Sequence, residues 1–439
     1  MKCSILILWL GIIISSCNGP QVPDARNIKD SANSLLTGAD QLYFDSTSFE
    51  SLLKEHKFDS GTTKQLQSFY KCRNYMFAWF TKDGISDITR IFWNLHENYI
   101  HDFVDTAATF RKVHQDISQE LSNTGRSSLQ KKTIAELELT SHFFVYVQNA
   151  YAGRGNPTAM QWFIPRKKLD PVALLNSFIA RKGKNTDEWE PVNTLYKRLK
   201  KELLHYGELA KSGGFGTIRP NQRHNYKPGD SSVTIKQIRQ RIQALGNKNV
   251  IDTSQVYSED LLLPIKSLQR SFGLREDGII TPALIKELNV PVNVRISQML
   301  LNLERMRWLP AEADSEFIAA NIPEFRLHVF EGEKKVFSID IVVGQAAHNT
   351  VIFADKLKYV VFSPYWNVPP SIVRKEILPA MRRNSNYLAR NNMEQKGTAG
   401  GLPIIRQKPG GANALGKVKF IFPNSYNIYF HDTPSKALF

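Results

Sequence analysis

The spacing of apolar residues changes its period along this chain of 439 residues, and that change is the strongest constraint on the fold. Up to about residue 310, apolar residues recur every three or four positions, as in ISDITRIFWNLHENYIHDFV, which is the period of an amphipathic helix. From Phe317 the pattern alternates, as in RLHVF and KVFSIDIVV, and a turn is expected at Glu331-Gly332-Glu333 between these strands. We therefore predict a multidomain α+β protein, in which mostly helical regions precede a mainly antiparallel β domain.

The chain is basic, with a formal net charge of +16, and a basic surface suits nucleic acid, an anionic membrane or an acidic polymer. Lysine and arginine are spread along the chain, and no nucleic-acid-binding motif with interleaved aromatic residues is present, so we expect no nucleic-acid partner. The ten histidines and three cysteines contain no H-E-x-x-H or similar cluster, and no glycine-rich phosphate loop follows a strand. We therefore expect neither a metal nor a cofactor.

The N-terminus has the features of an export signal. Lys2 precedes an apolar stretch, residues 4–14, that is too short to span a bilayer. The sequence Ile-Ser-Ser-Cys that ends at Cys17 resembles a bacterial lipobox, so we interpret residues 1–17 as a lipoprotein signal peptide with Cys17 lipidated, and residues 18–40 as a polar tether. The alternative is an ordinary secretory signal with a chance cysteine. Both interpretations place the mature protein in the cell envelope or periplasm, and lipidation would anchor it to a membrane.

Residues 41–226 form the first predicted domain, a mostly helical one. The stretch AELELTSHFFVYVQNAYAG is helical in pattern and ends at Gly153, which suits a helix C-terminus. Cys72 lies in the amphipathic stretch FYKCRNYMFAWF, and we expect it to be a small core residue.

Residues 227–290 are predicted to be a small three-helix module. Ile235, Ile238, Ile242 and Leu245 recur at helical spacing, Gly273 and Gly278 suit tight turns, and Thr281 with Pro282 suits the start of a helix. Residues 291–315 are predicted to form a linking helix, and residues 316–439 the β domain.

Motifs over most of the chain resemble those of the long periplasmic L,D-transpeptidases, which combine a scaffold domain, a peptidoglycan-binding domain and a YkuD-type catalytic domain. In residues 41–226 the resemblance rests on Tyr70, Arg73, Tyr75, Trp79-Phe80, Asp83-Gly84, Gly153-Arg154 and Pro157. In residues 227–290 it rests on LQRSFGL followed by DGII and TPAL, which resemble a three-helix peptidoglycan-binding domain. In residues 316–439 it rests on Val343-Gly344, SPYW at 363–366, Val368-Pro369, Arg406, KPG at 408–410, NALG at 413–416, FPN at 422–424 and YFHDTP at 429–434.

The resemblance implies an acyl transfer between the tetrapeptide stems of peptidoglycan, which cross-links their third residues through a cysteine thioester. It assigns His431 as the general base. Tyr365, Trp366, Arg406, Asn413 and Gly416 are the candidate substrate-binding residues. The alternatives are aromatic packing for Tyr365 and Trp366, solvated charge for Arg406, and a tight turn for Asn413 and Gly416.

In this family a Ser-His-Gly-Cys box with the nucleophile follows such a histidine, and residues 432–439 contain no such box. We therefore expect that the catalytic domain is truncated at its C-terminus and that the chain as written is inactive. The alternative hypothesis is a non-catalytic peptidoglycan-binding lipoprotein, a degenerate or truncated paralogue.

Overall fold

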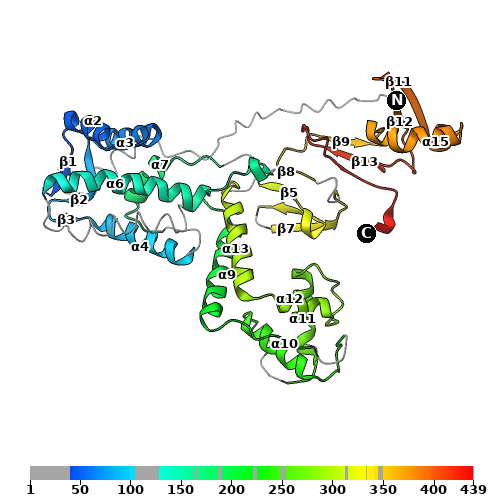
Figure 1. Cartoon of the computed structure of the whole chain (residues 1–439), viewed down its shortest axis with the longest axis horizontal. Helices are drawn as coiled ribbons and strands as arrows, with labels where there is room; N and C mark the ends of the chain where they lie inside the picture. Colours follow the sequence, from blue (N-terminus) through cyan, green and yellow to red (C-terminus); the bar gives the residue numbers. More distant parts are fainter. Residues whose placement is uncertain are drawn as a thin grey trace, which may run out of the picture. The chain divides into compact units, whose positions relative to one another are not determined.

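The computed structural model describes most of the chain after the predicted tether (Figure 1). The described residues are 40–103, 128–160, 162–164, 167–185, 190–220, 225–247, 250, 254–311, 315–332, 334–344 and 350–438. Cys17 and almost all of the predicted tether lie outside them. The chain divides into two compact units, Met1–Arg154 with Lys168–Pro191, and Gly155–Lys167 with Val192–Phe439. The predicted range 41–226 contributes to both units, and the predicted domain boundaries stay predictions.

The first unit combines helices with a small antiparallel sheet of order β1-β2-β3. Its strands are β1 (Gln41–Tyr43), β2 (Met76–Thr81) and β3 (Gly84–Ile85), and its helices are α2 (Ser46–Glu55), α3 (Ser60–Cys72), α4 (Asp87–Asp102), α6 (Leu129–Val147) with the π-helical turn Gln148–Ala152, and α7 (Pro171–Ala180). Asp45, Asp59 and Ser86 cap α2, α3 and α4, because each side chain accepts a hydrogen bond from a backbone N–H of the first turn.

The stretch FYKCRNYMFAWF is not one helix, so the helical expectation is wrong there. Helix α3 ends at Cys72, since Asn74 and Tyr75 have φ of 51° and 62°, and this left-handed backbone cannot continue a right-handed helix. Cys72 is exposed rather than in the core. The buried face of α3 instead carries Leu66, Phe69 and Tyr70.

A buried carboxylate, Glu136 on α6, holds α6 against β2. Its side chain is 0% exposed and accepts hydrogen bonds from the backbone N–H groups of β2 residues Ala78, Trp79 and Phe80 at 2.5, 2.9 and 3.2 Å. Tyr70 also donates its hydroxyl to Glu136 Oε1 at 2.9 Å. Burial raises the pKa of Glu136 to about 7, although the hydrogen bonds favour the charged form. This carboxyl group therefore titrates near neutral pH inside the core.

The first α-helix of the second unit is α9 (Thr194–Lys211). It packs against the long helix α13 (Val292–Arg307). Helix α13 falls within the predicted linking region, residues 291–315. Between these two helices in sequence lie α10 (Val233–Ala244), α11 (Glu259–Ser271) and α12 (Pro282–Leu288), which share one hydrophobic core. Three helices around one core thus lie within residues 227–290, and these bounds stay a prediction. Thr281 caps α12 by accepting from the N–H of Leu284.

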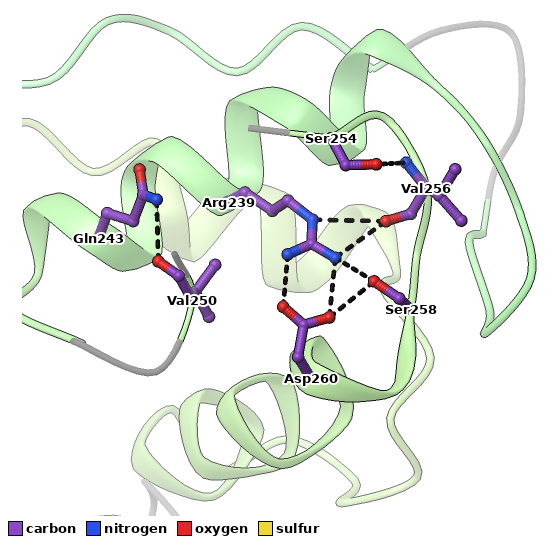
Figure 2. A network of polar contacts seen from close by, with 7 residues as sticks. All are labelled: Arg239, Gln243, Val250, Ser254, Val256, Ser258 and Asp260. Atoms are coloured by element: carbon purple, nitrogen blue, oxygen red, sulfur yellow. Dashed lines mark hydrogen bonds and ion pairs between the residues drawn. The ribbon is translucent and has the colours of Figure 1, made fainter. Parts of the chain in front are cut away.

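The buried side chain of Arg239 links two helices of this module through hydrogen bonds (Figure 2). The Arg239 side chain on α10 is 0% exposed, and its guanidinium donates to both carboxylate oxygens of Asp260 at 2.6 and 2.9 Å. It also donates to the Val256 carbonyl at 3.1 Å and to the hydroxyl of Ser258. The hydrogen bonds from Arg239 to the Asp260 carboxylate are the main cause that lowers the pKa of Asp260 to about 2. A two-pronged charge-assisted contact of this kind orients α10 relative to the start of α11.

The β part of the second unit is built of short antiparallel sheets. Its elements in chain order are β5 (Glu316–Asn321), the 3₁₀ turn Ile322–Glu324, β6 (Arg326–Glu331), β7 (Lys334–Asp340), β8 (Ile352–Phe353), β9 (Tyr359–Phe362), β10 (Trp366–Asn367), α14 (Pro370–Ile372), the π-helical turn Val373–Ile377, α15 (Leu378–Arg383), α16 (Tyr387–Arg390), β11 (Met393–Ala399), β12 (Leu402–Gln407), β13 (Val418–Ile421), β14 (Phe430–His431) and the 3₁₀ turn Lys436–Leu438. The sheet orders are β5-β6-β7, β10-β12-β11 and β14-β13-β9.

One strand of this part comes from far away in sequence. After the 3₁₀ turn Thr158–Met160, strand β4 (Trp162–Phe163) pairs in parallel with β8, with Trp162 opposite Ile352. The multidomain α+β class is therefore confirmed, with helices concentrated before residue 310 and antiparallel sheets after it. No helix within the described ranges is both long enough and apolar enough to cross a membrane.

The raised pKa of Glu136 predicts that the first unit loses stability as the pH rises. A carboxyl whose pKa is higher in the folded state stabilises the fold below its unfolded pKa of 4.5, and this contribution, about 3 kcal/mol, disappears as the pH passes 7. Hydrogen exchange of β2, corrected for intrinsic rates, should show more opening at pH 8 than at pH 5 in the wild type. Glu136→Gln should remove this pH difference. Glu55→Gln, which changes an exposed carboxyl group on α2, should keep it. Equal pH dependence in both variants would contradict the assignment.

Candidate functional site

The candidate base, His431, ends strand β14 and is exposed at the edge of the sheet β14-β13-β9. Its ring nitrogen Nδ1 is within hydrogen-bonding distance of the Asp432 carbonyl oxygen. Because a carbonyl can only accept, Nδ1 carries the proton in this contact. In the neutral ring the lone pair is then on Nε2, which is the ring nitrogen left to accept a proton.

The segment after His431 is fastened to the start of β13. The Asp432 N–H donates to the Val418 carbonyl at 2.9 Å, and the Asp432 carboxylate accepts the Lys417 N–H at 2.9 Å. The carboxylate also pairs with the ammonium of Lys436, and these contacts hold the pKa of Asp432 well below its usual range. These contacts fix the backbone directly after His431.

Gly416 permits this close approach. It has a φ of +62°, and a Cβ at this position would lie 2.5 Å from Asp432 Oδ2 and 2.7 Å from the Asp432 backbone carbon. Only glycine fits without a shift of the backbone that carries His431. Gly416 thus has a structural role next to His431, in agreement with the turn interpretation.

Asn413 organises the loop between β12 and β13. Its side chain is buried, and its amide group donates to the carbonyls of Pro364 at 3.1 Å and Lys408 at 2.9 Å, while its oxygen accepts the Leu415 N–H at 2.8 Å. The bond to Pro364 ties this loop to the turn between β9 and β10, where Ser363 also donates its N–H to the Lys417 carbonyl at 2.8 Å. The turn interpretation of Asn413 is supported by these contacts.

Arg406 and Tyr365 form one group of charged and aromatic side chains. The Arg406 guanidinium lies 3.9 Å from the centre of the Tyr365 ring and donates to Glu394 at 2.6 and 3.1 Å. Lys396 and Lys408 also approach Glu394, at 3.2 and 3.6 Å. The hydrogen bond from Arg406, followed by that from Lys396, lowers the pKa of Glu394 to about 2. Arg406 is therefore a paired charge, and the Tyr365 side chain, 47% exposed, presents the open surface.

Trp366, which follows Tyr365 directly, packs against a hydrophobic cluster. It is partly buried against the core formed by Val368, Val373, Ile377 and Ile405. Aromatic packing, the alternative interpretation, accounts for these contacts. The contacts of His431 are with Asp432 and with the Tyr429 ring, whose centre is 5.8 Å away.

Two polar residues of this region, Glu394 and Gln407, lie outside the motifs quoted from the sequence. The Gln407 side chain is buried, donates to the carbonyls of Asn391 at 3.1 Å and Ala412 at 3.3 Å, and accepts the Ala414 N–H at 2.9 Å. Alternation in LPIIRQ places Gln407 on the inward face with Ile405, and a polar residue there requires hydrogen-bond partners. That alternation is the signal that could have identified it. Among the described residues, His, Cys, Asp and Glu form no group of three suited to a metal ion.

The close approach at Gly416 predicts that Gly416→Ala destabilises the β part of the second unit by about 1–3 kcal/mol, because the added methyl group meets Asp432 and the φ becomes strained. Gly411→Ala is the matched control, since no atom lies within 4 Å of a Cβ built there. Urea unfolding of the two variants measures the difference, and equal stability would contradict this account.

Comparison with known proteins agrees with this architecture. Residues 64–203 match the family described as the scaffold domain, and residues 315–439 match the family described as the L,D-transpeptidase catalytic domain. A Haemophilus influenzae protein named "Putative L,D-transpeptidase" is 25% identical over 224 residues. That match covers 48% of this chain and 40% of the relative, so the chain spans less than half of that protein. The matches thus identify a scaffold domain at residues 64–203 and an L,D-transpeptidase catalytic domain at residues 315–439.

Proposed function

We propose that this protein takes part in cross-linking peptidoglycan between the third residues of neighbouring stem peptides, with His431 as the general base. The observation that carries the proposal is the bond from His431 to the Asp432 carbonyl within the matched catalytic domain. This bond leaves Nε2 as the proton acceptor. His431 is exposed, so a substrate can approach its ring.

The proposed reaction has two acyl transfers. In the first, imidazole takes the proton of a cysteine thiol, the thiolate attacks the carbonyl of the third residue, and the amide bond to the terminal D-alanine breaks. The departing amine takes up the proton from imidazole. In the second, an amine of another stem attacks the thioester and gives a proton to imidazole, the C–S bond breaks, and imidazole passes that proton to the thiolate. No oxidant or cofactor is needed, and residues 315–439 of the sequence contain no cysteine.

The substrate-binding proposal falls mainly on Tyr365. Arg406 is stacked on its ring and paired with Glu394, so we propose that Arg406 orients Tyr365 rather than receiving a stem carboxylate itself. Asn413 and Gly416 hold the backbone near the substrate, and Trp366 supports the strand that follows Tyr365.

The remaining parts of the proposal concern location. Lipidation of Cys17 would hold the protein at a membrane of the envelope, with residues 18–40 as tether, so that the scaffold and the catalytic domain face peptidoglycan. The module of residues 227–290 is proposed as a peptidoglycan-binding domain, in keeping with its LQRSFGL motif and three-helix core.

A second candidate function is a non-catalytic peptidoglycan-binding lipoprotein. One observation supports it: residues 227–290 contain a three-helix core and the LQRSFGL motif, which suit binding to peptidoglycan without catalysis. The two candidates differ in whether His431 matters for cross-linking in the cell.

His431→Ala in the chromosomal gene tests the base. General base catalysis contributes about 100-fold or more, so the substitution should lower the cross-links between third residues to the level of a deletion strain. Liquid chromatography with mass spectrometry of muropeptides measures them. His101→Ala, an exposed histidine on α4, is the control and should resemble the wild type. If deletion itself leaves these cross-links unchanged, the non-catalytic candidate is favoured.

The purified polypeptide of these 439 residues should form no acyl intermediate with a tetrapeptide stem, because its catalytic domain supplies no thiol. Intact-mass spectrometry after incubation should show the unmodified mass. A mass increase equal to the acyl part of the stem, located in residues 315–439 by peptide mapping, would refute this expectation.

A further inference from the structure

Three different side chains share one face of the sheet β14-β13-β9. Lys419 of β13 is directly opposite His431 of β14, and directly opposite residues of an antiparallel pair point to the same face. Tyr429 precedes His431 by two residues, and its ring centre is 5.8 Å from that of His431. The alternate positions Phe420 and Phe430 pair on the other face, where Phe430 packs against Phe422 at 4.8 Å. The first face thus presents an ammonium, a phenol ring and the candidate base.

Lys419 is held in place without a carboxylate. Its ammonium lies 3.6 Å from the centre of the Tyr429 ring, and burial lowers its pKa. In the described part of residues 350–438, ion pairs of lysines join Lys396 and Lys408 to Glu394 and Lys436 to Asp432, and Lys419 takes part in none. A cation that is partly removed from water and paired only with a ring gains from binding an anion.

The proposed reaction places an anion next to this cation. The amide nitrogen of the leaving D-alanine must come within hydrogen-bonding reach of the His431 ring, which returns a proton to it. The carboxylate carbon of the same D-alanine is two bonds away from that nitrogen. The side chain opposite His431 in the sheet is therefore well placed to meet the carboxylate, and that side chain is Lys419.

We propose that Lys419, oriented by the ring of Tyr429, binds the terminal carboxylate of the donor stem and thereby selects stems that end in a free carboxylate. This rests on the proposed function, since it names the recognition of the leaving residue at the same site. The pairing of Lys419 with His431 between β13 and β14 determines where the Lys419 ammonium can reach. The Tyr429 ring restricts the otherwise flexible lysine side chain.

The test measures binding, so it does not depend on a nucleophile. The probes are the tetrapeptide L-alanyl-γ-D-glutamyl-L-lysyl-D-alanine and its C-terminal amide, titrated into the full chain by calorimetry. All other carboxylates are common to the two peptides, so their difference in affinity reports the terminal one. A charge-assisted contact predicts about tenfold tighter binding of the free acid by the wild type.

Lys419→Met keeps the unbranched side chain and removes the charge, so it should bind the two peptides equally. Lys419→Arg should keep a preference for the free acid. Lys358→Met is the matched control, since Lys358 is exposed and precedes β9 at a position that alternates away from Val361, the partner of Lys419. It should behave as the wild type, and circular dichroism should show that all three variants fold.

The outcomes separate the two proposals. Loss of the preference in Lys419→Met alone supports the role of Lys419. Equal binding of acid and amide by the wild type, or a preference that survives Lys419→Met, overturns that role and leaves the proposed function standing. Absence of binding for both peptides overturns the role of Lys419 and counts against the stem peptide as the ligand of this domain.

Discussion

The pairing of β13 with β14 on one side and β9 on the other is the constraint on which the site depends. Backbone hydrogen bonds in this sheet set the register, and a shift of β14 by one residue would turn His431 to the face opposite Lys419. Phe430 would then lose its packing against Phe422. Burial of the aromatic face therefore stabilises the register that presents the candidate base.

Hydrogen bonds join the loop between β12 and β13 to the turn between β9 and β10, next to this sheet. Asn413 fastens the loop between β12 and β13 to the turn at Pro364, and Gly416 lets Asp432 come against the same loop. Buried amide side chains of this kind must satisfy both their donors and their acceptors, so they tolerate few alternative loop conformations. Such loops give the backbone around His431 a defined position without a large core.

The helical regions use buried charge for the same purpose. Glu136 accepts hydrogen bonds from three backbone N–H groups of β2. Arg239 donates hydrogen bonds to Asp260 through two nitrogens of its guanidinium (Figure 2). A buried charge is costly unless its partners are all in place, so each of these groups favours a single packing of its neighbours. Specific geometry, more than added stability, is what these groups contribute.

The sequence by itself determined the α+β class and the change from helices to strands near residue 310, because these follow from the local period of apolar residues. It also determined the caps and turns of the three-helix module, such as Thr281, which act over a few residues. Only the tertiary structure decided that Arg406 is paired with Glu394, that β4 joins β8, and that Lys419 faces the same side as His431. These contacts join distant segments, and their register depends on packing that no local pattern encodes.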